Sequence, residues 1–123
     1  MPPNKVVSPK VVFDTNIYIS AIVFGGNPRV CLEMARAGEI RLFTSKVLLL
    51  ELAKKLRSKF NYSETEIKEI IVGISKFAKI VEPREKKADF IISGDKRHIL
   101  PLKKFEGTKI ISAADFIKQR PFP

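Results

Sequence analysis

Residues 10–24, "KVVFDTNIYISAIVF", predict the first unit of the fold, because an apolar run that ends in an acid leads directly into a helical pattern. The β-branched and aromatic residues before the acid are typical of a buried strand, and Gly25-Gly26 marks the end of the helix. The same alternation continues along the chain. We expect further strands at about 39–45, 79–83, 89–93 and 108–112, with helices in the remaining long segments.

Strands that alternate with helices predict an α/β domain with a mainly parallel sheet. Local signals mark several helix starts: Ser45 or Thr44 is placed to cap the helix of residues 45–60, and Ser112 the last helix. Ser63, followed three residues later by Glu66, is a capping-box pattern. The length of 123 residues fits one domain, residues 1–123.

Composition predicts a soluble protein that has an acidic partner. Apolar residues make up 45% of the chain, but no apolar run approaches the roughly 20 residues of a membrane span, and no secretory signal is visible. The single cysteine, Cys31, fits a reducing cytoplasm. The 23 Lys and Arg against 13 Asp and Glu give a net charge of +10, which favours nucleic acid as the partner over a merely solvated surface.

Three acids stand where a site could form. Asp14 ends the first strand and Asp95 follows the strand of 89–93, so both are expected at the edge where parallel strands have their carboxyl ends. Each alone is more often a helix cap or turn residue. Glu51 flanks the apolar face of its helix, where it could simply pair with Lys55. If the three carboxylates converge, a hard divalent cation such as Mg²⁺ or Mn²⁺ would relieve their repulsion.

The stretches "VVFDTNIYISAIVFGGNP", "LFTSKVLLLELAKKL" and "ADFIISGDKRHIL" resemble PIN-domain proteins, in particular the VapC-like toxins of prokaryotic toxin–antitoxin systems. The resemblance implies a three-layer α/β/α fold with a mainly parallel sheet of about five strands. It also implies a Mg²⁺- or Mn²⁺-dependent ribonuclease whose catalytic, metal-binding acids are Asp14, Glu51 and Asp95. The supporting polar positions would be Thr15, Asn16, Ser45 and Ser93.

Two basic residues add to this site. Lys96 and Arg97 follow Asp95 directly, so we expect them to hold a phosphate of the nucleic acid near the metal.

Residues 79–92 depart from the family pattern. Members of the family usually carry a crossover segment here, with an Asp-Pro-x-Asp motif and a helix, whereas this chain has the short charged link 84–87. Four residues cannot span three strands and return along a fourth, so we expect an altered arrangement. Either the deletion is real, with the strand of 79–83 displaced or paired as a hairpin with 89–93, or a segment is absent from the sequence, or a partner chain supplies it. The acid of that motif normally completes the site in the family. We assign this role to neither Asp89 nor Glu85.

Two functions therefore remain open. The first is a PIN-type endoribonuclease that cleaves single-stranded RNA, acts as the toxin of a toxin–antitoxin pair, works in the cytoplasm and forms a homodimer. The alternative is a degenerate PIN domain that binds RNA or a protein partner without cleavage, because one carboxylate fewer weakens metal binding.

Overall fold

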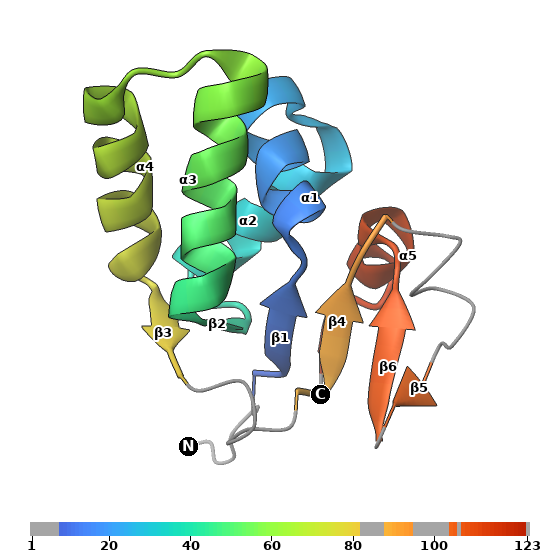
Figure 1. The fold of residues 1–123 in the computed structure, drawn as a ribbon. Helices are drawn as coiled ribbons and strands as arrows, with labels where there is room; N and C mark the ends of the chain where they lie inside the picture. Colours follow the sequence, from blue (N-terminus) through green and yellow to red (C-terminus); the bar gives the residue numbers. More distant parts are fainter. Residues whose placement is uncertain (1–7, 82–87, 95–103, 106, 123) are drawn as a thin grey trace.

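The computed structural model describes residues 8–81, 88–94, 104–105 and 107–122. Helices and strands alternate along the chain as the sequence predicts (Figure 1). The elements are β1 (Lys10–Phe13), α1 (Thr15–Ile19), the π-helical turn η1 (Ser20–Phe24), α2 (Gly26–Arg36), β2 (Arg41–Thr44), α3 (Lys46–Phe60), α4 (Glu64–Ser75), β3 (Ala78–Ile80), β4 (Phe90–Ile92), β5 (Lys104–Phe105), β6 (Thr108–Ile111) and α5 (Ala113–Ile117).

Side-chain caps determine where four of these helices begin. In each case a side-chain oxygen accepts a hydrogen bond from a backbone N–H of the first turn, which otherwise has no partner inside the helix. The predicted capping box of α4 is complete, since Ser63 and Glu66 each accept from the other's backbone N–H. The capping residues of α1, α3, α4 and α5 are Asp14, Ser45, Ser63 and Ser112.

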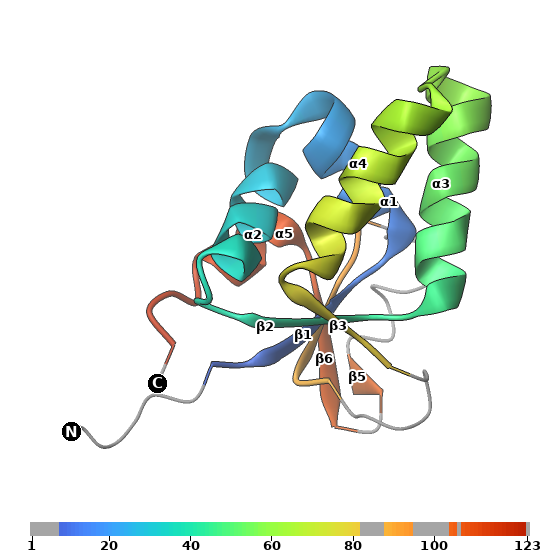
Figure 2. The ribbon, with the colours of Figure 1, turned by 90° about the vertical axis from the view of Figure 1, so that its left-hand side faces the viewer.

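The strands form one sheet in the order β3-β2-β1-β4-β6-β5. Every neighbouring pair is parallel except β5 and β6, so five strands are parallel, as expected. Helix α3 packs against α1 and α4, and α2 packs against α5 and against η1, so the α1–η1 segment lies between the other helices (Figure 2). Five parallel strands in one sheet with these helices are consistent with the PIN-like three-layer α/β/α class. No described helix is long and apolar enough to cross a bilayer.

The core forms between the helices and the sheet, and the strand face that carries Val11 contributes most of its strand residues. The register places Val11, Leu42 and Phe90 side by side on this face, and the ring of Phe90 packs edge-on against that of Phe116 in α5. Cys31 in α2 is completely buried, as its apolar surroundings in the sequence indicate, and burial raises the pKa of its thiol to about 12. This packing holds the helices in place around the carboxyl ends of β1 and β4.

The expectation of a hairpin, or of a displaced strand, between residues 79 and 93 is wrong. Strand β3 pairs in parallel with β2 at one edge, and β4 lies beyond β1. Backbone hydrogen bonds hold both ends of the connection on the sheet, from Val81 N to Thr44 O at 2.9 Å and from Asp89 N to Lys10 O at 2.8 Å.

The error lies in the assumed strand lengths. Strands β3 and β4 have three residues each, so the connection comprises residues 81–89 rather than 84–87 alone. The ten Cα steps from Ile80 to Phe90 can span about 33 Å. Three strand spacings of about 4.8 Å, with a return of about 10 Å along one short strand, require less than that. The parallel order can therefore close without a helix in this connection.

Tyr18→Phe tests a buried pair of hydroxyl groups, those of Tyr18 and Thr44. The Tyr18 hydroxyl and the Thr44 hydroxyl are buried, and neither makes a hydrogen bond of normal geometry with a described residue. Burial raises the pKa of Tyr18 to about 12, and the nearby Thr44 hydroxyl lowers it in part. Removing a poorly bonded hydroxyl should leave the free energy of unfolding unchanged or raise it by up to about 1 kcal/mol in urea denaturation.

Tyr62→Phe is the matched control, because Tyr62 is only partly buried and its change should stay within about 0.5 kcal/mol. A loss of more than about 1.5 kcal/mol in Tyr18→Phe alone would show that the Tyr18 hydroxyl makes a full hydrogen bond.

Candidate functional site

The carboxyl ends of β1 and β4 bring Asp14 and Ser93 together. These two strands are neighbours in parallel register, with Phe13 opposite Ile92, so the residues that follow them lie at the same level of the sheet. The backbone N–H of Asp14 donates to Ile92 O at 3.1 Å, which extends the pairing by one residue. Ligand sites of open parallel sheets lie at this edge.

The Asp14 carboxylate is fixed by two donors. Its Oδ1 accepts from Ile17 N at 3.0 Å, and its Oδ2 accepts from the Ser93 hydroxyl at 2.5 Å. The simple interpretation of Asp14 as a helix cap is therefore correct, and the carboxylate is held in one orientation as well. Each carboxylate oxygen keeps lone-pair capacity after one hydrogen bond, so the cap does not prevent Asp14 from binding a cation.

Thr15 links Asp14 to Glu51. The Thr15 side chain is buried, and its hydroxyl donates to Glu51 Oε1 at 3.0 Å. Glu51 comes from α3, and its side chain is 49% exposed, so one carboxylate oxygen is held near α1 while the group remains open to solvent. The structure thus places two of the three predicted acids next to the same residue, Thr15.

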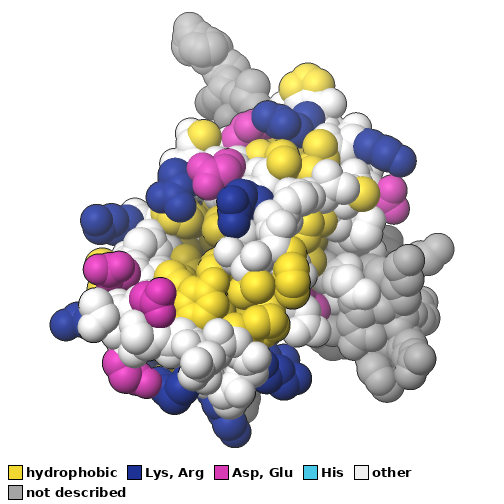
Figure 3. Space-filling view, turned by 90° about the horizontal axis from the view of Figure 1, so that it is seen from above, with side chains coloured by type: hydrophobic (Ala, Val, Ile, Leu, Met, Phe, Trp, Pro, Cys, Tyr) yellow, Lys and Arg dark blue, Asp and Glu magenta, His cyan; other side chains and the backbone are white. Residues whose placement is uncertain are grey.

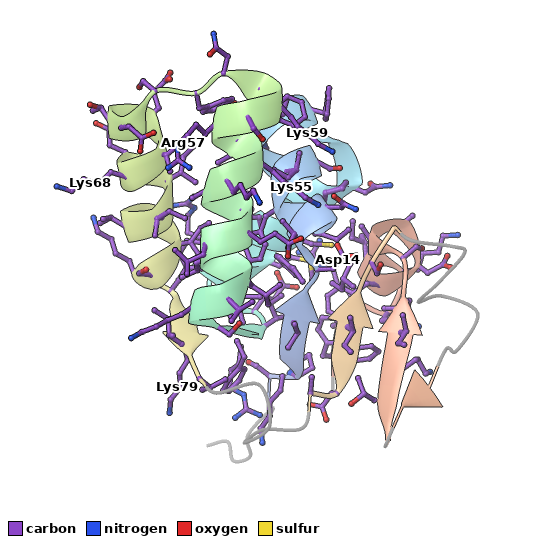
Figure 4. All side chains as sticks on the ribbon, in the orientation of Figure 1. Asp14, Lys55, Arg57, Lys59, Lys68 and Lys79 are labelled. Carbon is purple, nitrogen blue, oxygen red and sulfur yellow. The ribbon has the colours of Figure 1, made fainter. Side chains whose placement is uncertain are left out.

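Lys55 joins this group through its predicted pair with Glu51 and through a contact with α1 that the sequence did not indicate. Its Nζ lies 3.7 Å from Glu51 Oε2 and donates to Asn16 Oδ1 at 3.4 Å, so it bridges α3 and α1. Its side chain is 27% exposed. The i, i+4 spacing in the sequence indicates the pair with Glu51, but the contact with Asn16 depends on how α1 and α3 pack. Figure 4 shows Lys55 above Asp14, on the side of α3 that faces α1.

Ser45, another predicted supporting residue, has a structural role. Its hydroxyl accepts from Leu48 N at 3.2 Å and caps α3, and the side chain is buried at the carboxyl end of β2. It therefore sets the start of the helix that carries Glu51. Of the four predicted supporting residues, Thr15 and Ser93 bind the acids directly and Asn16 binds Lys55.

Asp95, Lys96 and Arg97, together with Glu85, lie outside the described residues. Asp89 is exposed at the amino end of β4 and accepts from Lys10 N at 2.8 Å, at the opposite end of the strands from Asp14. Across the described ranges, no group of three or more His, Cys, Asp or Glu side chains could hold a metal ion.

The described part of the site is thus the pair Asp14 and Glu51, with their hydrogen-bond partners. Two carboxylates are the hard oxygen donors that Mg²⁺ and Mn²⁺ prefer, and such ions commonly bind through one or two carboxylates and complete their coordination with water. The donor set therefore fits a divalent cation, with the place of Asp95 left as a prediction.

A family model described as a PIN domain matches residues 10–88. The matched range includes Asp14, Glu51 and Thr15, and it ends before Ser93 and Asp95. No curated protein matches the chain.

A double-mutant cycle on Ser93→Ala and Asp14→Asn tests the bond that fixes the first acid. Ser93→Ala should lower the free energy of unfolding by about 1–3 kcal/mol, because a buried hydroxyl that donates to a carboxylate is lost. With Asn in place of Asp14 the loss should be smaller, giving a coupling energy of about 0.5–2 kcal/mol in urea denaturation.

Ser112→Ala is the control for this cycle. The Ser112 hydroxyl caps α5 by accepting from the backbone N–H of Asp115, and it makes no described contact with Asp14. Its effect should add to that of Asp14→Asn within about 0.5 kcal/mol. If the effects of Ser93→Ala and Asp14→Asn on the free energy of unfolding were also additive, the Ser93 hydroxyl would not stabilise Asp14.

Proposed function

This chain belongs to the PIN domain family, whose members are generally nucleases, and from that premise we propose that it is a metal-dependent endoribonuclease. The substrate in this proposal is single-stranded RNA, and the reaction is hydrolysis of a phosphodiester bond. The observation that carries the proposal is the Asp14 carboxylate, fixed by Ser93 at the carboxyl ends of β1 and β4 and linked through Thr15 to Glu51.

Charge supports the choice of substrate. The chain carries a net charge of +10, and a field of that sign concentrates polyanions around the protein. In this proposal, the acids form a small negative site in a protein whose net charge is strongly positive. Lys and Arg side chains can bind the phosphate backbone around it, while the carboxylates hold a cation at the scissile bond.

The residues of the site have separable tasks in this proposal. Asp14 and Glu51 would hold a Mg²⁺ or Mn²⁺ ion, with Asp95 as a further ligand. The ion supplies Lewis-acid polarisation of the scissile phosphate and an activated water. Ser93 and Thr15 orient the two carboxylates before any substrate arrives, which spares the reorganisation that free side chains would need. Lys55 offsets the charge of Glu51 and lies close enough to the site to contact a phosphate.

The partner and the assembly are further parts of the proposal. The resemblance to VapC-like toxins leads us to propose an antitoxin protein as the partner and a homodimer as the working form. These parts rest on the sequence resemblance alone.

The degenerate form remains as a second candidate, and one observation favours it. Residues 81–89 contain no Asp-Pro-x-Asp motif, so this connection lacks the residue pattern that usually provides the further acid. At the site, the described residues offer two carboxylates, one of them already paired with Lys55. A site with fewer charges binds divalent ions more weakly, so RNA could be bound without being cut.

Asp14→Asn and Glu51→Gln should abolish metal-dependent cleavage of a labelled single-stranded RNA, because each removes a charged ligand. Ser93→Ala and Thr15→Val should lower the rate by roughly 10- to 100-fold, the usual effect of losing a residue that orients a metal ligand. The measurement is the initial cleavage rate in Mn²⁺, with circular dichroism confirming that each variant is folded.

Asp115→Asn is the control for these rates, since Asp115 is exposed in the first turn of α5 and should be neutral. Cleavage that survives in both Asp14→Asn and Glu51→Gln would rule this site out.

Calorimetric titration with Mn²⁺ separates the two candidate functions without a substrate. An active site should bind Mn²⁺ at millimolar concentrations or tighter in the wild type, and this binding should disappear in Asp14→Asn. Lys55→Met should strengthen binding by up to about fivefold, because the ammonium group no longer competes for Glu51. No heat of binding at millimolar Mn²⁺ in either the wild type or Lys55→Met would favour the degenerate form.

A further inference from the structure

Phe24 is exposed to an unusual degree for an aromatic residue close to the site. It ends η1, and 73% of it is exposed, the largest value among the exposed large hydrophobic residues of the described chain. Its ring packs edge-on against Phe60, the last residue of α3, with centroids 6.0 Å apart and planes at 79°. The ring is therefore held at its edge while most of its surface faces solvent.

Hydrogen bonds fix the turn that carries Phe24. Gly25 follows it with a φ of +86°, a backbone conformation that residues other than glycine rarely adopt. The Gly25 N–H donates to Ser20 O at 2.8 Å. The Arg29 guanidinium donates to Ala21 O at 2.9 Å and to Ile22 O at 3.2 Å. These bonds satisfy the carbonyls of η1 and hold Phe24 in place before any ligand binds, which lowers the entropic cost of binding.

Basic residues connect this ring to the acids. Lys59 precedes Phe60, and Lys55 lies one helical turn earlier, a rise of about 6 Å. Figure 4 shows both lysines on the side of α3 that faces α1, in line above Asp14. Seen from above, hydrophobic side chains occupy the middle of the surface, with Lys and Arg side chains and several Asp and Glu side chains around them (Figure 3).

A basic track beside an exposed aromatic ring is the arrangement that binds single-stranded nucleic acid. Phosphates contact the lysines, and a base stacks on the ring, which contributes roughly 1–3 kcal/mol per base. A single exposed hydrophobic residue needs no such explanation by itself. Here, however, the ring packs against Phe60, and Arg29 holds the turn that carries it. The lysines lie along α3 between Glu51 and Phe60, a rise of nine residue steps or about 13 Å.

We propose that Lys55, Lys59 and Phe24 form an RNA-binding track, in which the lysines bind phosphates and a base a few nucleotides from the acids stacks on Phe24. This inference rests on the proposed function, because it takes RNA as the ligand. It adds where the RNA on one side of the scissile bond lies. Charge complementarity favours RNA over a protein occupant, because Lys55 and Lys59, one helical turn apart on α3, lie between the acids and Phe24.

The test is equilibrium binding of a fluorescein-labelled, single-stranded 12-residue oligoribonucleotide, measured by anisotropy in EDTA so that cleavage plays no part. Phe24→Ala should weaken binding roughly 5- to 100-fold, whereas Phe24→Trp should bind at least as tightly as the wild type. Leu50→Ala is the matched control, because Leu50 is 70% exposed on α3 and belongs to no part of the track. Lys59→Gln should weaken binding and reduce its salt dependence by about one counterion.

Wild-type affinity in Phe24→Ala would overturn the proposal. So would unchanged affinity in Phe24→Leu, which keeps the hydrophobic surface but not the ring, because it would show that no base stacks on the ring. Failure of the nuclease proposal is distinguishable: Phe24-dependent binding in EDTA without cleavage in Mn²⁺ supports the track and rejects the enzyme. Cleavage by the wild type together with unchanged RNA affinity in Phe24→Ala does the reverse.

Discussion

The hydrogen bond from the Ser93 hydroxyl to the Asp14 carboxylate is the interaction on which the site depends. It crosses between β1 and β4, two strands that are far apart in the sequence and adjacent in the sheet. The same carboxylate caps α1 through Ile17 N, so one side chain joins two strands and a helix. The fold therefore sets the orientation of the Asp14 carboxylate before any cation could bind to it.

The contacts around Glu51 extend this constraint to α3. Thr15 fixes one of its oxygens and Lys55 approaches the other, so the second acid is oriented but also partly neutralised. A site of this kind balances two demands. The carboxylates must be close enough to share a cation, and their charge must be compensated when no cation is bound. Lys55 meets the second demand. In the proposed function, the balance between its ammonium group and a metal would decide between an active enzyme and a degenerate binding domain.

The connection between β3 and β4 shows how strand length governs topology. A parallel strand order with three spacings between consecutive strands usually calls for a long crossover. Here the strands have three residues each, so the nine residues 81–89 can reach across the sheet. The prediction of a hairpin failed because strand ends were taken from apolar runs, whereas the actual ends depend on which backbone groups of β1 and β2 remain available for pairing.

The sequence by itself determined the features that act over a few residues. The caps at Ser45, Ser63 and Ser112, the alternation of strands and helices, and the acid at the end of β1 all follow from local hydrogen bonding and apolar periodicity. Only the tertiary structure decided that Thr15 binds Glu51, that Lys55 reaches Asn16, and that Phe60 supports the exposed ring of Phe24. These contacts join side chains from different elements, so they depend on the packing distance and rotation of α1, η1 and α3, which no local pattern encodes.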